Sequence, residues 1–228
     1  GIRAFCLYRG IGEVSKIQQL EVANNSVALL SSTYFGPVQW YQKLNRYGLC
    51  LLERHDHFVK QTYRNRCLIA TAAGQQALTV PTGHGESSKC AMANMRVSDH
   101  GNWRHLHWNA LQSAYGESPF FEYYADDIKP FFQQRWDNLF DFNLAITLKL
   151  CELLDIRPNL QLTDQYADAD KLQADDFRDA IRPKKPLPDP SFVATPYYQV
   201  YQQKHGFLPN LSILDLLFNE GNEAIFFL

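Results

Sequence analysis

The chain has 228 residues, of which 46% are hydrophobic and 14% aromatic, so it can bury one sizeable core. Its 22 lysine and arginine residues nearly balance 24 aspartate and glutamate residues, and the formal net charge of −2 argues against a general nucleic-acid-binding protein. No run of about 18 apolar residues occurs, which predicts that no segment spans a membrane.

The sequence predicts a single domain preceded by an extension. Residues 1–26 look unlike the rest of the chain and are interpreted as an N-terminal extension, and residues 27–228 as one domain. The predicted fold class is α/β, with an N-terminal βαβ Rossmann-like sheet, a helical region and a docked C-terminal helix. An α+β arrangement is the alternative.

The first elements of the domain form a strand–helix–strand pattern. Residues 27–30 and 49–52 are short apolar runs typical of buried strands. Between them, apolar residues recur at helical spacing from Val38, and Pro37 suits the first turn of a helix. A βαβ unit of this kind makes its strands parallel and sets ligand-binding loops at their carboxyl ends, here residues 31–36.

The next segment predicts strands again. Residues 63–71 and 76–80 read as two strands around a turn at residues 72–75, which predicts a hairpin. Residues 91–97 predict a further strand.

From Trp103 onward the hydrophobic period changes to three and four, which predicts helices. The first covers residues 103–115 and has Asn102 as its expected N-cap. A second begins at Ser118 and is kinked or ended by Pro130. Residues 136–154 predict the third and most regular helix.

The C-terminal third begins with a change in composition. Residues 157–196 are rich in aspartate and proline and predict a long, partly extended surface connection. Residues 197–201 predict one more strand. Ser212 and Asp215 have the spacing of a capping box, and Gly221 is expected to end the helix that follows.

The segment around Arg64 is the first candidate site. If residues 63–71 form a strand, Arg64 and Arg66 point to one face and Asn65 to the other. Two guanidinium groups on one face can hold a phosphate or a carboxylate. The alternative is a solvated edge face with surface ion pairs of little energetic value.

His107 is the second candidate. Trp103 and His107 are four residues apart on the predicted helix and share a face. Imidazole moves a proton easily near neutral pH, which would suit a proton shuttle or a ligand donor. An ordinary hydrogen-bonded histidine is the alternative.

Other common chemistry has little support in the sequence. In His55-Asp56-His57 the two histidines would share a face of a strand and could bind one metal ion. No third ligand shows matching spacing, so no metal site is predicted. The nucleotide-binding loops and the serine-hydrolase elbow are absent, and no cofactor is assigned. The five cysteines are odd in number, widely spaced and without a C-x-x-C pair, which is typical of reduced thiols in a cytosolic protein and predicts a cytoplasmic location.

An ordered set of motifs resembles the WbqC-like family over about residues 27–228. These motifs are Tyr34-Phe35, Trp40-Tyr41 with Lys43, Tyr63-x-Asn65-Arg66, Leu78-Thr79-Val80-Pro81, Asn102-Trp103-x-x-x-His107 and Leu211 to Gly221. The segment with Asp176, Phe177 and Arg178 also looks like the form seen in the Bacteroidetes branch. Many members carry His-Gln-Pro before the first tyrosine, where this chain has Leu30-Ser31-Ser32, so the role of that histidine cannot be transferred.

The resemblance implies a role in bacterial surface polysaccharide (O-antigen) biosynthesis. The first hypothesis is an enzyme that transfers an acyl or aminoacyl group to an activated sugar, with His107 as general base. The second is a non-catalytic ligand-binding or assembly protein of the same pathway, and the third is a Rossmann-type nucleotide-dependent ligase or nucleotidyltransferase. The expected partner is a sugar or sugar nucleotide, and the oligomeric state is not predicted. The residues expected to bind it are Tyr34, Lys43, Arg64, Asn65, Arg66, Asn102, Trp103, Arg178, Asp215 and Asn219.

Overall fold

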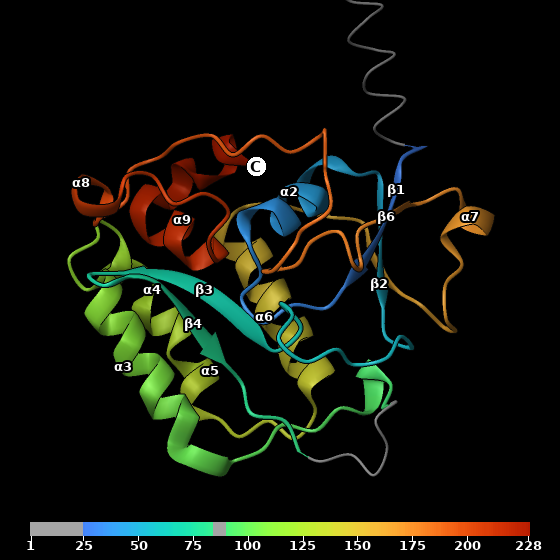
Figure 1. Cartoon of the computed structure of the whole chain (residues 1–228), viewed down its shortest axis with the longest axis horizontal. Coiled ribbons are helices and arrows are strands. Elements are labelled where there is room, and N and C mark those ends of the chain that lie inside the picture. Colours follow the sequence, from blue (N-terminus) through green and yellow to red (C-terminus); the bar gives the residue numbers. More distant parts are fainter. Residues whose placement is uncertain (1–24, 84–89) are drawn as a thin grey trace, which may run out of the picture.

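A computed structural model describes residues 25–83 and 90–228 of the chain (Figure 1). Most of the predicted N-terminal extension and most of the polar loop before Cys90 lie outside the described residues. The described part has mixed helices and a parallel sheet, which confirms the α/β class.

The main sheet has four strands, all parallel, in the spatial order β5-β2-β1-β6. Helix α2, Val38–Arg46, connects the two central strands and confirms the predicted βαβ unit. Pro37 stands just before that helix, at its N-cap position. The strands are β1 Val27–Ser31, β2 Leu49–Glu53, β5 Leu160–Leu162 and β6 Asp175–Asp176.

The strand order places a topological switch point next to β1. Counted in chain order within this sheet, the strands lie in the order 3-2-1-4, the order with which doubly wound dinucleotide-binding sheets begin. From β1 the chain moves outward through β2 to β5, and it then returns to add β6 on the other side of β1. In sheets of this kind ligands bind at the carboxyl ends of the strands where the order reverses, which here is between β1 and β6.

Both outer strands come from the aspartate-rich segment for which the sequence predicts an extended connection. Between them lies a short helix, α7, Ala169–Leu172, capped by Asp168. Strands of two and three residues are too short to show a period, which explains why the pattern did not reveal them.

The predicted hairpin is present but begins later than expected. Strand β3, Arg66–Thr71, pairs antiparallel with β4, Gly74–Thr79. Residues 63–65 form a turn, so the prediction that Arg64 and Arg66 share one strand face is wrong.

Two other strand predictions are also wrong. Residues 91–97 contain the 3₁₀ helix η1, Met92–Asn94, followed by isolated bridges, and residues 197–201 form no strand. In both places the apolar side chains pack on the core from irregular backbone.

The helical region follows the predicted pattern closely. Pro130 occupies the first position of α5 and separates it from α4. The N-cap prediction for Asn102 is wrong, because its backbone is left-handed (φ 47°) and its side chain makes no capping bond, whereas Asn138 caps α6. The helices are α3 Trp103–Tyr115, preceded by η2 His100–Asn102, then α4 Phe121–Ile128, α5 Pro130–Gln133 and α6 Leu139–Leu153.

The C-terminal segment packs on the core. Helix α8, Gln202–His205, precedes α9, Ile213–Glu220, whose N-cap Ser212 accepts a hydrogen bond from the backbone of Leu214. Gly221 ends α9 with a positive φ, as predicted, and the 3₁₀ helix η3, Gly221–Phe227, follows.

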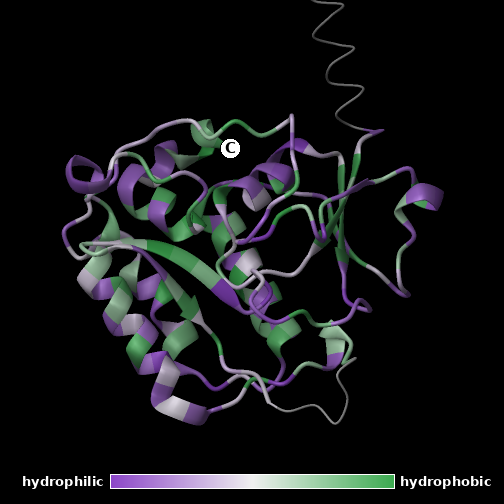
Figure 2. Ribbon diagram, in the orientation of Figure 1, coloured by the Kyte–Doolittle hydropathy of each residue, from purple (hydrophilic) through white to green (hydrophobic). Residues whose placement is uncertain are grey.

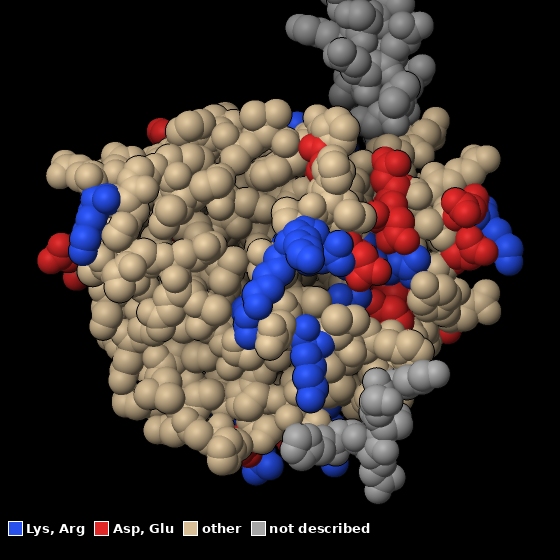
Figure 3. Space-filling model, viewed as in Figure 1, with Lys and Arg blue, Asp and Glu red and all other residues tan. Residues whose placement is uncertain are grey.

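The layers are visible in the figures. In Figure 1 helix α6 runs through the middle of the molecule, with the parallel sheet on one side and the hairpin with α3 on the other. Figure 2 shows apolar segments of α6, α9, β1 and β3 gathered in the interior. On the face drawn in Figure 3 the charged side chains gather over the sheet, whereas the surface over the helices is mostly uncharged.

Candidate functional site

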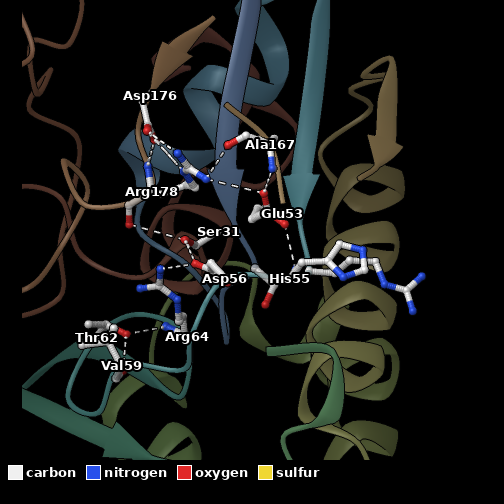
Figure 4. Close-up of polar contacts among 12 residues, drawn as sticks. Ser31, Glu53, His55, Asp56, Val59, Thr62, Arg64, Ala167, Asp176 and Arg178 are labelled. Atoms are coloured by element: carbon white, nitrogen blue, oxygen red, sulfur yellow. Dashed lines mark hydrogen bonds and ion pairs between the residues drawn. The ribbon is translucent and has the colours of Figure 1, made fainter. Parts of the chain in front are cut away.

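The carboxyl ends of the parallel strands carry polar residues. Ser31 is the last residue of β1, Glu53 the last of β2 and Asp176 the last of β6. Figure 4 shows these side chains at one edge of the sheet, together with Asp56, Arg64 and Arg178 from the loops that follow. This is the edge at which α/β sheets bind ligands.

Arg178 joins the outer strand to the centre of the sheet. Its Nε and Nη2 donate to both carboxylate oxygens of Asp176 at 2.7–3.2 Å, and its Nη1 donates to the carbonyl of Ala167 at 3.0 Å. Nη1 also approaches Glu53 Oε2 at 3.5 Å. Burial raises the pKa of Asp176, but the hydrogen bonds and charge of Arg178 outweigh it and hold that pKa below its usual value.

Glu53 is fully buried and well satisfied. Its carboxylate accepts hydrogen bonds from the Thr163 hydroxyl at 2.9 Å and from the backbone of His55 and Ala167 at 2.7 Å each. Four donors, with Arg178, offset much of the cost of burying this charge. Glu53 therefore serves to hold the loops in place.

Arg64 and Asp56 form a buried ion pair on the other side of β1. Arg64 Nη2 lies 2.5 Å from Asp56 Oδ2, and the Ser31 hydroxyl donates to the same oxygen at 3.4 Å. Burial raises the pKa of Asp56, and the neighbouring Arg64 opposes but does not cancel this rise. Asp56 is thus a stronger base than an exposed aspartate.

Helix α6 fixes the two loops that carry these groups. Asn143, which is fully buried, donates from Nδ2 to the Arg64 carbonyl at 2.8 Å and to the Ser32 hydroxyl at 3.3 Å. Gly36 closes the loop after β1, because a Cβ there would lie 2.3 Å from Thr33 Oγ1. The Thr33 hydroxyl therefore lies close against Gly36 within the same loop.

A small pocket of about 10 Å³ lies between the ends of β1 and β6, which is room for about one water molecule. Thr33 Oγ1 and Arg64 Nε are buried and have no hydrogen-bond partner among the described residues, and the same holds for Asp56 Oδ1. We call this pocket with its polar rim the switch-point crevice. Its lining includes Ser31, Ser32, Thr33, Arg64, Arg178 and Ile181.

His107 lies away from the crevice. Its Nδ1 shares a 2.8 Å hydrogen bond with the Tyr34 hydroxyl, and its ring packs against Trp103, with centroids 5.1 Å apart. Burial lowers its pKa to about 4, against an opposing hydrogen bond with the backbone of Thr79. His107 is therefore neutral at pH 7, and its contacts join α3 to the loop after β1.

Asn65 and Arg66 face the hairpin. Asn65 Nδ2 donates to the Val80 carbonyl at 3.0 Å, and Arg66 Nε donates to Thr79 Oγ1 at 3.0 Å. Neither residue lines the switch-point crevice, and His107 does not line it either. The structure thus brings Arg64 and Arg178 to one crevice, while the ligand roles of Asn65, Arg66 and His107 stay predictions.

Lys43 holds a segment that runs beside the crevice. Its Nζ lies 2.6 Å from Asp189 Oδ2 and 2.7 Å from the Ser191 hydroxyl, and it is almost fully buried. Burial lowers the pKa of Lys43, and Asp189 opposes this effect. Residues 182–191, which we call the strap, are therefore latched to α2 next to Phe177, a residue of the crevice lining.

Asp215 and Asn219 anchor the C-terminal helix. Asp215 is fully buried and accepts hydrogen bonds from Tyr115 and Tyr197 at 2.8 and 2.7 Å and from Gln199 at 2.9 Å. Burial raises its pKa against these three bonds. Asn219 Nδ2 donates to the Asp215 carbonyl at 2.7 Å, so both residues have an evident role in the fold.

Sequence reasoning missed one residue of the crevice lining, Thr33, and the partner of another, Asp56, which pairs with Arg64. Thr33 lies in the predicted ligand loop, residues 31–36, but was not singled out. Asp56 was considered only within a metal-binding triplet. The signal that could have found them is position, since both follow directly on buried parallel strands whose carboxyl ends meet.

Comparisons with known proteins place the chain. The WbqC-like protein family matches residues 32–182 and 189–226. The chain belongs to this family. It is also similar to the uncharacterised protein Rv1507c of Mycobacterium tuberculosis, with 27% identity over 190 residues that cover 73% of this chain and 81% of that protein. No solved structure matches the chain.

The two matched segments contain Thr33, Arg64 and Arg178 of the crevice and helix α9, and the interval between them falls within the strap. In the described part of the chain, no helix is long and apolar enough to cross a membrane.

Proposed function

We propose that this WbqC-like protein binds an activated sugar through an anionic group in the switch-point crevice, and that it transfers an acyl or aminoacyl group to that sugar in surface polysaccharide biosynthesis. The family membership supports the pathway, as the resemblance implied. The position of the crevice at a switch point supports the site.

The observation that carries the proposal is the set of buried donors without partners. Buried polar groups are nearly always hydrogen-bonded, so Thr33 Oγ1 and Arg64 Nε are expected to have a partner in the ligand-bound protein. A hydroxyl and a guanidinium suit the oxygens of a phosphate or a carboxylate. Arg178 adds positive charge at the same edge of the sheet.

Asp56, the ion-pair partner of Arg64, is the proposed proton acceptor. Its Oδ1 has no partner among the described residues, and its raised pKa favours base catalysis. For transfer to an amino sugar, the amine would attack the acyl carbonyl, a C–N bond would form and the C–S bond of the thioester donor would break. Asp56 would take the proton from the amine and pass it to the departing thiolate, which would leave as the thiol. His107, predicted from the sequence as the base, would first have to give up its bond with Tyr34.

The closed pocket favours a second candidate, a non-catalytic sugar-binding protein of the same pathway. A space for about one water does not admit a sugar and a donor together unless the loops that line it move. Ligand binding without turnover is the outcome that this candidate predicts.

The experiment combines binding and product analysis. Glucosamine 1-phosphate and UDP-N-acetylglucosamine are titrated by calorimetry into the wild-type protein and into Thr33→Val. We expect at least one to bind, and Thr33→Val to weaken it about 10-fold or more. Glucosamine 1-phosphate with acetyl-coenzyme A, followed by mass spectrometry, then tests transfer. Binding that Thr33→Val leaves unchanged, or no binding at millimolar concentration, contradicts the crevice as the site.

Two variants separate the proton acceptors. Asp56→Asn should lower turnover about 100-fold or more, whereas His107→Gln should lower it less than 10-fold if His107 only positions Tyr34. A larger loss of turnover in His107→Gln than in Asp56→Asn would indicate His107 as the base instead.

A further inference from the structure

A second and larger pocket lies on the opposite side of the aromatic core. It has a volume of about 310 Å³, which is at the lower end of the range for small-molecule sites. The first turn of α3 and the residues around α5 form it, far along the chain from the strand ends. Its lining includes Asn102, Arg104, Trp108, Lys129, Phe132 and Gln133.

The pocket carries net positive charge. Arg104 and Lys129 line it, and the one carboxylate paired with Arg104 is Asp99, at 2.7 Å. Asp99 is shared with Arg135, whose Nε lies 3.0 Å from its other oxygen and 3.6 Å from Asp137 Oδ1. Arg104 therefore does not have the charge of Asp99 to itself. His105, which also lines the pocket, accepts or donates a bond with Asn109 at 2.9 Å.

Arg104 keeps donor capacity that Asp99 does not use. Its Nε and Nη2 have no hydrogen-bond partner among the described residues, and its guanidinium lies 4.8 Å from the centre of the Trp103 ring. The side chain is 17% exposed. Both nitrogens are buried, and buried donors are nearly always paired, so they are available to an anionic group that fills the pocket.

The opposite wall is aromatic. Trp108 packs against Phe121 and Phe132, with ring centroids 5.9 and 5.8 Å apart. Phe132 is buried, so these rings are fixed before any ligand arrives. The exposed amides of Asn102 and Gln133 add donors and acceptors at the rim. Such a wall suits the apolar face of a sugar ring, whose hydroxyl groups would meet the amides.

We propose that this pocket binds a phosphorylated sugar, with the phosphate on Arg104 and Lys129 and the ring against Trp108. The site is separate from the crevice, because the two pockets share no lining residue. The chain therefore has two anion-binding sites, which suits a protein that handles a donor and an acceptor, or a substrate and a regulator.

Calorimetry with glucose 1-phosphate at low salt tests this site. We expect Arg104→Gln and Lys129→Gln each to weaken binding about 5-fold or more. Lys171→Gln is the matched control, since Lys171 lies on α7 with its side chain 83% exposed and lines neither pocket, and it should leave affinity unchanged. Inorganic phosphate should bind at least about 3-fold more weakly than glucose 1-phosphate, because it lacks the ring.

The crevice is controlled in the same titration. The titration is repeated in Thr33→Val, in which binding to the crevice is expected to be weakened. Binding of glucose 1-phosphate that persists in Thr33→Val and falls again when Arg104→Gln is added belongs to the second pocket, whereas complete loss of binding in Thr33→Val alone would show that the probe binds the crevice and would overturn the second site. Equal affinity in wild type, Arg104→Gln and Lys129→Gln would overturn it as well, as would the absence of any binding in wild type. Melting temperatures of Arg104→Gln, Lys129→Gln and Lys171→Gln within about 2 °C of wild type ensure that a loss of affinity is not a loss of folding.

Discussion

The change Thr33→Val tests the crevice with two readouts of opposite sign. Valine has nearly the shape of threonine, so the substitution removes the hydroxyl and leaves the packing of the loop. Thr33 is 3% exposed, and its Oγ1 has no hydrogen-bond partner among the described residues. The hydroxyl thus contributes little to the free protein and is expected to act on the ligand.

The expected magnitudes follow from this environment. Leaving a buried hydroxyl unpaired costs about 1–3 kcal/mol, so Thr33→Val should stabilise the ligand-free protein by about 1 kcal/mol. For a chain of this size that is an increase of about 2–4 °C in melting temperature. A hydrogen bond to a charged group is worth about 1.5–3 kcal/mol, so affinity for the anionic sugar should fall about 10- to 100-fold.

Thr163→Val is the matched control. Thr163 is also buried and lies directly after a neighbouring strand, but its hydroxyl donates to Glu53 at 2.9 Å and accepts from the Arg54 backbone at 3.2 Å. The same substitution there should destabilise the protein by about 1–3 kcal/mol. Urea unfolding measures both changes. Destabilisation of Thr33→Val by more than about 1 kcal/mol, or an unchanged affinity, would refute the reasoning.

Three further predictions concern other buried polar contacts of the fold. His107 has a pKa of about 4 in the folded protein, below the value of about 6.5 for an unfolded histidine, so the unfolded chain takes up its proton first as the pH falls. Stability should therefore drop by about 2 kcal/mol between pH 7 and pH 5 in urea unfolding, and His107→Gln should lose this contribution; an identical pH dependence in both proteins would contradict the burial of the ring. Asp189→Asn leaves Lys43 buried without its carboxylate and should cost about 3 kcal/mol, against less than about 0.5 kcal/mol for the exposed Asp170→Asn; equal effects would mean that the strap is not latched. Tyr197→Phe removes one of three donors from Asp215 and should lower the free energy of unfolding by about 1.5–3 kcal/mol, whereas a neutral result in chemical denaturation would show that the carboxyl needs only two.

The fold was predictable where the hydrophobic pattern is long enough to show a period. The helix at Val38–Arg46 and the helices at Trp103–Tyr115 and Leu139–Leu153 appear close to their predicted bounds. The strands β5 and β6 could not be predicted, because two or three residues show no alternation. The exposed aspartates of β6 also argue against a strand. Only the tertiary structure, in which β1 and β2 already exist, makes these edge strands form.

The candidate site was predictable in residue type but only partly in place. Arg64 and Arg178 were named from the sequence and both line the crevice. The sequence could not show that the backbone turns at residues 63–65, which separates Arg64 from Arg66 and buries it against Asp56. A turn held by a distant residue, here Asn143 of α6, leaves no local signal.

Unpartnered polar atoms alone do not make a site in this protein. The buried oxygens of Tyr41 and Thr147 also lack a partner at full hydrogen-bond geometry, yet they interact with each other between α2 and α6 and line neither pocket. What distinguishes Thr33 and Arg64 is that they come from different loops and meet where the strand order reverses. The charges around them are already offset by hydrogen bonds to Glu53 and Asp176, so the remaining donors do not serve to hold the loops. We therefore propose that these donors bind a molecule that enters from outside.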